Sequence, residues 1–341
     1  MPSTRDNGGA DDEFTARAEA FRRELLAHCY RMTGSVDDAE DLVQETYLRA
    51  WKSYGGFEGR ASLRTWLYRI ATNACLTALQ HRERRVLPSG LGAPSDDPYA
   101  PSVLGDPGTR WIQPVPDALF AAAPDDPEAT VISRDSIRLA LIASLQYLPP
   151  KQRAVLILRD VLAWPAAEVA RSLDTTTPAV KSLLQRARRR IEEVTPSMDD
   201  VVEPSHPRAR ELLRGYLAAF EAADIDAIER LLRADAVLEA VPVRSWYSGK
   251  KTCLRYLAHQ ALGSPGEWRM RPADLNGEAG FAAWHRAADG SYEAFGVGMI
   301  TPTGTGIARI IVFSDPATVH RLGGLDFARR TAETLPGDST P

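Results

Sequence analysis

The chain has 341 residues, 44% of them hydrophobic and 25% charged, which is ordinary for a folded, water-soluble protein. This length favours two or three domains over one. The net charge of −4 excludes a uniformly basic protein, although a whole-chain value can conceal basic patches. Three widely spaced cysteines form no zinc-binding motif, and no apolar run is long enough to cross a bilayer. We therefore expect a cytoplasmic protein that carries no metal and no cofactor.

Residues 1–13 have the composition of a disordered tail, and residues 14–86 carry a helical pattern. Within the latter, SVDDAEDLVQETYLRAW (Ser35–Trp51) has an apolar stripe that extends to its last residue, a tryptophan, and an acidic opposite face. Ser35 precedes Asp38 by three residues, so its hydroxyl can cap the free amides of a first helical turn. Taken alone, this segment is an amphipathic helix with a solvated acidic face.

A second segment, GRASLRTWLYRIATNACLTALQHRERR (Gly59–Arg85), has the pattern of one basic helix with aromatic residues among its arginines. Basic residues with aromatics suit partly single-stranded nucleic acid, because unstacked bases need flat faces and phosphates need cations. Trp66, however, recurs at core spacing with Leu67 and Ile70, which favours packing over base stacking for this side chain. Asn73 is ambiguous, because its amide can read a base edge or only make a packing contact.

Proline, glycine, serine and aspartate dominate residues 87–130, which predicts a linker longer than compact domains usually need. It contains RWIQPVPD (Arg110–Asp117), an unusual sequence to leave in solvent. Residues 131–196 return to helical spacing and predict a helix-turn-helix, whose first two helices are expected at Lys151–Val161 and Pro165–Leu173.

The third helix of this motif is expected to begin at Thr177 and Pro178, where a capping hydroxyl and an N1 proline restart the helix. Its outward face is basic, so it can enter a major groove while its cations contact phosphates. The alternative at this point is a solvated basic helix in an ordinary helical bundle.

The last part of the chain, residues 206–331, lies between a short linker at 197–205 and a tail at 332–341 and has a different character. Helices are expected first, and strand-like runs separated by turn sequences such as NGEAG and TPTGTG follow. This order predicts an α+β domain with a curled antiparallel sheet. The expected helices span Arg208–Ala223, Asp226–Arg233 and Lys250–Leu262.

The order of LLAHCYRMTGSVDDAEDLVQETYLRAWKSY, RASLRTWLYRIATNACLTALQHRERR, a linker and VKSLLQRARRRI is similar to that of bacterial sigma-70 family factors, and more narrowly of the extracytoplasmic-function group. The resemblance covers residues 14–195. It implies a protein that binds core RNA polymerase, recognises the −10 and −35 promoter elements and initiates transcription without catalysing a reaction itself. It also implies that the linker, with Trp111, threads toward the RNA exit path of the polymerase.

The same resemblance implies three sets of functional residues. Polymerase contacts are expected from Asp41, Leu42, Gln44, Glu45 and Tyr47. Contacts with the −10 element are expected from Arg60, Arg64, Trp66, Arg69 and Asn73. Contacts with the −35 element are expected from Thr177, Lys181, Ser182, Gln185, Arg186, Arg188 and Arg189. The alternative is a metabolite-responsive helix-turn-helix regulator that does not act as a sigma factor, but such a protein has no need of the first two sets.

Residues 206–331 resemble the SnoaL-like polyketide-cyclase fold, which ketosteroid isomerase shares and in which a curled sheet and helices surround a conical cavity. The fold hosts enzymes, binding proteins and dimerisation modules. His285 and Glu239 are the nearby titratable candidates for acid–base chemistry, but they form no matched pair. The sequence therefore favours a regulatory module over a ligand-binding site, and either over catalysis. The residues that could line a pocket are Trp246, Tyr247, Trp268, His285 and Tyr292.

We therefore predict a multidomain protein that is not an enzyme. Two all-α helical domains, sigma-2-like and sigma-4-like with the helix-turn-helix, precede an α+β domain with a cone-shaped curled sheet. The expected partners are core RNA polymerase and promoter DNA, with a small ligand or an intramolecular contact for the C-terminal domain and no membrane.

Overall fold

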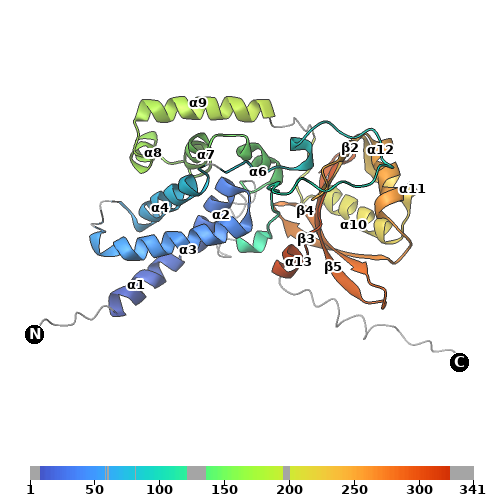
Figure 1. Cartoon of the computed structure of the whole chain (residues 1–341), viewed down its shortest axis with the longest axis horizontal. Helices are drawn as coiled ribbons and strands as arrows, with labels where there is room; N and C mark the ends of the chain where they lie inside the picture. Colours follow the sequence, from blue (N-terminus) through green and yellow to red (C-terminus); the bar gives the residue numbers. More distant parts are fainter. Residues whose placement is uncertain are drawn as a thin grey trace, which may run out of the picture. The chain divides into compact units, whose positions relative to one another are not determined.

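The chain divides into two compact units (Figure 1). Unit 1 contains residues 1–86, 109–113 and 119–197, and unit 2 contains residues 87–108, 114–118 and 198–341. The segment expected to be a free linker is thus shared between the two units. Among the described residues, no helix combines the length and hydrophobicity that a membrane crossing requires. The computed structural model describes residues 8–57, 59, 61–80, 82–120, 136–194 and 200–322.

The first helical module of unit 1 is built from α1 (Gly8–Glu19), α2 (Arg22–Thr33), α3 (Val36–Ser53) and α4 (Leu63–Ala78), with a 3₁₀ turn at Tyr54–Gly56. α1 begins inside the segment expected to be a disordered tail, and it packs through Phe14 and Ala18, which are both buried. α2 ends at Gly34, whose left-handed conformation (φ 69°) suits glycine at a helix end. The hydroxyl of Ser35 then accepts a 3.1 Å hydrogen bond from the amide of Asp38, which confirms the predicted cap.

The second helical module of unit 1 is built from α6 (Leu139–Gln146), α7 (Pro150–Leu156), α8 (Ala166–Ser172) and α9 (Thr177–Val194), with a π-helical turn at Ile157–Val161. α8, the turn after it and α9 form the predicted helix-turn-helix. The hydroxyl of Thr176 accepts a 3.3 Å hydrogen bond from the amide of Ala179, so α9 is capped one residue earlier than predicted. Val180, Leu184 and Ala187 bury the inner face of α9.

Two buried arginines join these modules within unit 1. Arg31 of α2 donates to the carbonyl and the hydroxyl of Ser136. Arg153 of α7 donates to the carbonyl of Met32 and to the side chain of Gln146. Burial lowers the pKa of each arginine to about 10. Because these buried cations are held by carbonyl, hydroxyl and amide oxygens, any rearrangement that removes those oxygens leaves a charge without compensation.

The modules also meet along α4. The hydroxyl of Thr65 donates to the carboxylate of Glu168 (3.1 Å), and the ring of Tyr68 contacts the ring of Trp164 edge-on, with centroids 5.6 Å apart. Trp164 is itself buried. Unit 1 therefore holds the expected sigma-2 and sigma-4 modules together in one compact body.

Unit 2 is built on a sheet whose described strands follow the order β2-β1-β6-β5-β4-β3. Neighbouring strands pair antiparallel except β1 and β6, which are parallel. The expectation of a wholly antiparallel sheet is therefore wrong at this pair. The strands are β1 (Leu232–Val241), β2 (Trp246–Ser248), β3 (Trp268–Leu275), β4 (Glu278–Arg286), β5 (Tyr292–Thr303) and β6 (Gly306–Phe313).

The helices of unit 2 lie close to the predicted positions. They are α10 (Pro207–Glu221), α11 (Ile225–Leu231), α12 (Lys250–Tyr256) and α13 (Pro316–Arg321), with a π-helical turn at Leu257–Ala261. α11 ends before β1, which takes over the last residues of a segment expected to be helical. The difference concerns Leu232 and Arg233, and sequence patterns locate the ends of helices and strands less well than their existence.

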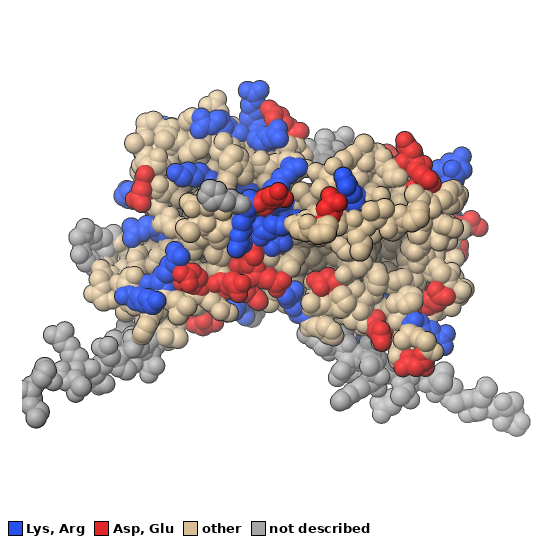
Figure 2. Space-filling model, in the orientation of Figure 1, with Lys and Arg blue, Asp and Glu red and all other residues tan. Residues whose placement is uncertain are grey.

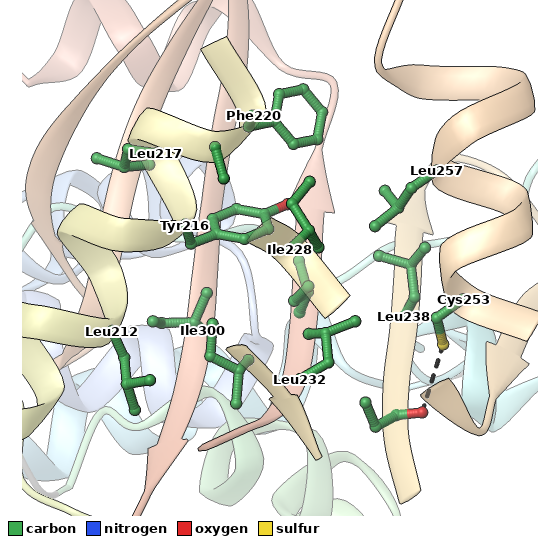
Figure 3. Close-up of a cluster of buried hydrophobic side chains, with 14 of the residues drawn as sticks. Leu212, Tyr216, Leu217, Phe220, Ile228, Leu232, Leu238, Cys253, Leu257 and Ile300 are labelled. Atoms are coloured by element: carbon green, nitrogen blue, oxygen red, sulfur yellow. Dashed lines mark hydrogen bonds between the residues drawn. The ribbon is translucent and has the colours of Figure 1, made fainter. Parts of the chain in front are cut away.

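The core of unit 2 fills the space between the helices and one face of the sheet (Figure 3). Tyr216 and Phe220 project from α10, and Ile300 of β5 lies among them. The thiol of Cys253 in α12 donates to the carbonyl of Ala236 (3.4 Å). Burial raises the pKa of Tyr216 above its usual range. The interior of this curled sheet is therefore packed with side chains rather than open.

His28 of α2 is fully buried, with its Nε2 2.9 Å from the hydroxyl oxygen of Thr72. That hydroxyl donates its own proton to the carbonyl of Tyr68 (2.7 Å). The Thr72 hydroxyl oxygen therefore accepts a hydrogen bond from Nε2–H of His28, and the imidazole is neutral. Burial and, to a smaller degree, the charge of Arg31 lower the pKa of His28 to about 3.

We predict that unit 1 loses stability in acid through His28. Its pKa in the folded chain lies below the unfolded value of about 6.5. Between these values the unfolded chain binds the additional proton, so the free energy of unfolding falls as the pH falls from about 6.5 toward 3. One such group contributes a slope of at most about 1.4 kcal/mol per pH unit. Urea denaturation followed by circular dichroism should show a shallower pH dependence for His28→Phe than for the native chain, and equal slopes would contradict this assignment.

Candidate polymerase and nucleic-acid interfaces

α3 presents a mixed acidic and polar surface. Asp41 and Gln44 are exposed, as a contact surface requires. Glu45 is partly buried and forms an ion pair with Arg49 (2.6 Å), one turn further along the helix. In Figure 2, acidic side chains gather over the region of α3. Three of the five residues expected to contact polymerase therefore lie on the surface of this helix.

The other two residues of that set face inward. Leu42 is 8% exposed and belongs to the core of the module. Tyr47 is partly buried, and its hydroxyl donates to the carbonyl of Ala18 in α1 (3.1 Å). Burial is also the main cause that raises the pKa of Tyr47 above its usual range. These two side chains support the surface of α3 from within, and a direct contact of either with polymerase stays a prediction.

Two large apolar side chains on α3 were missed by the sequence analysis. Leu48 is 54% exposed and Trp51 is 49% exposed. Residues three and four apart share a helix face, so Leu48 and Trp51 continue the surface of Asp41 and Gln44. Trp51 was assigned to the inner stripe, but that stripe leaves the core before the last turn of the helix. The available signal was Leu48, an apolar residue outside the inner stripe.

Asp38 at the start of α3 is the centre of an arginine cluster. Its carboxylate lies 2.9 Å from Arg85, 2.7 Å from Arg110 and 3.6 Å from Arg82. Burial acts to raise the pKa of Asp38, but the hydrogen bond from Arg85 and the charges of the three arginines outweigh it and hold the pKa below its usual value. This part of the acidic face is therefore neutralised within unit 1 and differs from the exposed carboxylate of Asp41.

The basic segment Gly59–Arg85 is not one helix, because α4 ends at Ala78. The arginines beyond that end make contacts of their own. Arg84 stacks on the ring of Tyr147 at 4.1 Å, and Arg85 donates to the carbonyl of Trp111 (2.7 Å). These cations bind other parts of unit 1 rather than continuing a basic helical face.

The residues expected to meet the −10 element differ in their availability. Arg64 is paired with Glu24 (2.6 Å). Arg69 and Asn73 are exposed on α4. Arg60 lies outside the described residues.

Trp66, the remaining member of the −10 set, packs in an aromatic cluster. Its ring centroid lies 4.9 Å from that of Phe57 and 6.4 Å from that of Tyr54. The side chain is half-buried, as the core spacing in the sequence favoured. The cluster joins α4 to the 3₁₀ turn that follows α3, so Trp66 serves the packing of this module.

α9 carries the residues expected to meet the −35 element, and Figure 2 shows basic side chains along it. Lys181, Ser182, Gln185, Arg186 and Arg189 are exposed, and Thr177 is partly buried at the start of the helix. Arg188 is also exposed, but both of its terminal contacts go to the carboxylate of Asp160, at 2.7 and 2.9 Å. The set therefore lies on one helix, and Arg188 is committed to a partner within the module.

The structure does not bring the expected pocket residues of the C-terminal domain together. Trp246 and Tyr247 lie on β2, and Trp268 lies on β3, at the opposite edge of the sheet. Tyr247 is buried against the ring of Tyr256 (centroids 4.4 Å apart). A single pocket lined by all five residues is therefore wrong, because sequence spacing gave no information on strand order.

A shallow hollow of about 350 Å³ does exist near the β3 edge, lined by Trp268, His285, Ala287, Glu293, Ala294 and Phe295. His285 is exposed, and the Trp268 indole donates to the carbonyl of Ala261 (2.9 Å). Tyr292, the last residue of the expected set, donates its hydroxyl to the carbonyl of Gly266. Glu239 is buried on β1 and paired with Arg309, so it and His285 do not form an acid–base pair.

A helical module joined to a helix-turn-helix with a basic, exposed third helix is an arrangement suited to a DNA-binding transcription factor. In agreement, residues 18–85 match the family Sigma-70 region 2, and residues 138–191 match Sigma-70, region 4. The chain is 47% identical over 313 residues to the ECF RNA polymerase sigma factor SigG of Mycobacterium tuberculosis, covering 91% of this chain and 84% of the relative.

Two further similarities extend this comparison. SigJ of Mycobacterium tuberculosis is 32% identical over 219 residues, which covers 64% of this chain and 61% of SigJ. The crystal structure of SigJ superimposes with a TM-score of 0.58 and 25% identity, covering 90% of this chain and 98% of that chain. The chain belongs to the extracytoplasmic-function (ECF) sigma factors of RNA polymerase, and the helix-turn-helix regulator considered as an alternative is not favoured.

We predict that Arg186→Ala lowers promoter-dependent initiation while Arg190→Ala, the same charge change on the flank of the same helix, has a smaller effect. Arg186 lies on the outward face of α9 next to Ser182 (3.0 Å), whereas Arg190 pairs with Glu193 (3.2 Å). Loss of a base-edge contact costs about 1–3 kcal/mol, or roughly five- to 150-fold in initiation. Run-off transcription under limiting factor measures both variants, and equal losses would remove the distinction between the two positions.

Proposed function

We propose that this sigma factor docks on core RNA polymerase through α3, contacts the −10 element through α4 and contacts the −35 element through α9, and that its C-terminal domain regulates these steps. The observation that carries the proposal is the presence of exposed residues of suitable chemistry on all three helices. The proposed polymerase-binding surface consists of Asp41, Gln44, Glu45, Leu48 and Trp51.

The surface of α3 suits a protein partner better than DNA. Asp41 carries an exposed negative charge, which repels phosphates and attracts a basic protein surface. Leu48 and Trp51 supply exposed apolar area, and a buried tryptophan is a frequent energetic centre of protein interfaces. Core RNA polymerase is the protein partner that membership of the sigma family implies.

The two DNA-contacting helices have different chemistry. On α4, Arg69 can hold a phosphate and Asn73 can read the edge of an exposed base. On α9, Arg186 and Gln185 offer hydrogen bonds to base edges, while Lys181 offers a cation to a phosphate. Strand separation and the reaction itself belong to polymerase in this scheme, and this chain supplies recognition.

The compact form of unit 1 is incompatible with contacting both promoter elements at once. Centres that lie about 25 base pairs apart are roughly 85 Å apart along B-form DNA. In unit 1, however, α4 and the second module touch through Thr65 and Glu168. The two modules must therefore separate when the factor engages a promoter, and the form described here is a resting form in this proposal.

The C-terminal domain is proposed as a regulatory module rather than an enzyme. The space beneath α10 is filled by a hydrophobic core, and its buried carboxylate, Glu239, is already neutralised by Arg309. Deletion of residues 206–341 tests the regulatory role. Promoter-specific transcription that is unchanged by the deletion under all conditions would refute it.

The sigma-factor function itself is tested by run-off transcription with core polymerase, and the cytoplasm, where bacterial transcription occurs, is the proposed site of action. Initiation from specific promoters that requires this chain supports the proposal. Firm binding to duplex DNA without any initiation would support a helix-turn-helix regulator instead.

We predict that Leu48→Ser with Trp51→Ser weakens binding to core polymerase by at least about tenfold, because truncating apolar side chains at the centre of an interface costs more than about 1 kcal/mol each. Val201→Ser, which removes a similarly exposed apolar side chain from unit 2 (39% exposed), serves as the control and should bind normally. Titration of labelled factor with core enzyme gives both dissociation constants. Equal affinities for the two variants would exclude this face of α3 as the docking site.

We also predict that the two helical modules separate on a promoter. Fluorophores on Ser53→Cys and Glu192→Cys report the distance between α3 and α9, and labelling is selective because Cys29, Cys75 and Cys253 are buried. Energy transfer should be high in the free factor and should fall when core polymerase and promoter DNA are added. The same transfer efficiency in both states would show that unit 1 does not open.

A further inference from the structure

Several contacts hold the described part of the linker on unit 2, including those at three places. The first place is a buried carboxylate on the sheet. Glu239 of β1 is 1% exposed. Its Oε2 accepts a 2.9 Å hydrogen bond from the amide of Ser89, and its Oε1 accepts from Arg309 of β6. Leu87 and Pro88, which precede Ser89, are buried as well. The first residues of the linker are thus seated on the sheet rather than in solvent.

The second place is an antiparallel bridge between Leu104 of the linker and Val243 of the loop before β2. The amide of Gly105 donates to the carbonyl of Pro242 (2.9 Å), and the amide of Arg244 donates to the carbonyl of Val103 (2.8 Å). Leu104 and Val243 are therefore a pair without a direct hydrogen bond between them, the type with the shorter Cα separation of about 4.5 Å.

The third place is the turn between β3 and β4. Asn276 is fully buried and has a left-handed conformation (φ 52°). Its Oδ1 accepts a 2.9 Å hydrogen bond from the amide of Val115, and its own amide donates to the carbonyl of Val115 (3.0 Å). The amide of Gly277 donates to the carboxylate of Asp117 (2.8 Å). Val115 is fully buried, so this contact combines backbone hydrogen bonds with the burial of an apolar side chain.

The linker is held as an extended peptide rather than as a folded part of the core. Tyr99, Val103 and Leu104 remain 55%, 58% and 64% exposed, so this stretch contributes little buried apolar area. Many of its contacts are hydrogen bonds to the linker backbone, including those from the side chains of Trp246 to the carbonyl of Gly92 (2.8 Å) and of Gln260 to that of Ala100 (3.2 Å). Recognition by main-chain bonds and a few side-chain sites is the mode by which domains bind extended peptides at a sheet or loop edge.

We propose that the C-terminal domain is a peptide-binding domain whose occupant is the linker of this same chain, and that the linker leaves it when the factor engages polymerase. This inference rests on the proposed function and on the path toward the RNA exit channel of the polymerase that the sigma-factor resemblance implies for the linker. The amides of Ser89 and Val115 cannot bond to unit 2 while the same residues extend along that path. The linker is therefore the element through which the C-terminal domain opposes initiation.

A reversible lock tests the proposal in the full chain. Leu104→Cys with Val243→Cys places two thiols at a close antiparallel pair, whose Cα separation suits a disulfide. The native cysteines are buried. Oxidation should cross-link the pair and lower promoter-dependent initiation at least about tenfold, and reductant should restore it. The two single-cysteine variants, treated in the same way, are the controls and should be unaffected by oxidant.

The outcomes separate this inference from the function on which it rests. Loss of initiation on oxidation, with recovery on reduction, supports linker release. Undiminished initiation by the fully cross-linked factor would overturn it, and so would failure of the two thiols to cross-link, since they would then not be neighbours. Absence of initiation by the native chain would instead refute the sigma-factor function.

A variant that loosens the linker provides the opposite test. Asn276→Gly keeps the left-handed turn, which glycine adopts freely, but removes the acceptor for the amide of Val115. One lost hydrogen bond shifts linker occupancy by about fivefold, so initiation at limiting factor should rise by up to that amount. Hydrogen exchange of the Gly277 amide in the native chain should also accelerate when core polymerase is added. No gain in the variant and no change in exchange would overturn the inference even if the cross-linked protein folded poorly.

Discussion

The arrangement of unit 1 depends on one buried cation, Arg153. Its guanidinium reaches from the second helical module to the carbonyl of Met32, at the end of α2 in the first module. The same group holds Gln146, and the Gln146 side chain lies where a Cβ on Gly34 would approach it to within 3.1 Å. The left-handed glycine that ends α2 therefore also admits the second module. The same residues thus serve both the end of α2 and the contact between the modules.

A buried cation held by neutral oxygens has a particular energetic consequence. Desolvation of the guanidinium opposes burial, and the hydrogen bonds that it donates to carbonyl and amide oxygens offset this cost only while all of them are present. Such a contact is specific in geometry but contributes little net stability. This is the property expected of an interface that must form a defined resting state and still open when polymerase and DNA offer larger surfaces.

The sequence predicted most of the secondary structure and the order of the helical modules, because these follow from local periodicity and caps such as Ser35. It did not predict partners that are distant along the chain. Asp38 was counted in an acidic face, and only the fold shows that Arg85 and Arg110 neutralise it. The pocket residues of the C-terminal domain were separated for the same reason, since strand order places β2 and β3 at opposite edges. Trp51 was assigned to the inner stripe, which leaves the core before the last turn of α3, whereas Leu42 was assigned to polymerase only through the family resemblance.

The linker shows why composition alone misleads about order. Proline, glycine and aspartate disfavour a helix or a central strand, and this was correctly inferred for residues 87–118. The same residues can still be fixed when another surface supplies partners for their amides, as Glu239 does for Ser89 and Asn276 does for Val115. Each of these bonds contributes only about 1 kcal/mol net, unlike the packed core beneath α10, whose disruption would unfold the domain. The linker is thus bound firmly enough to have one position and weakly enough to be exchanged for another partner. A segment that must serve both a resting and an active state requires that balance.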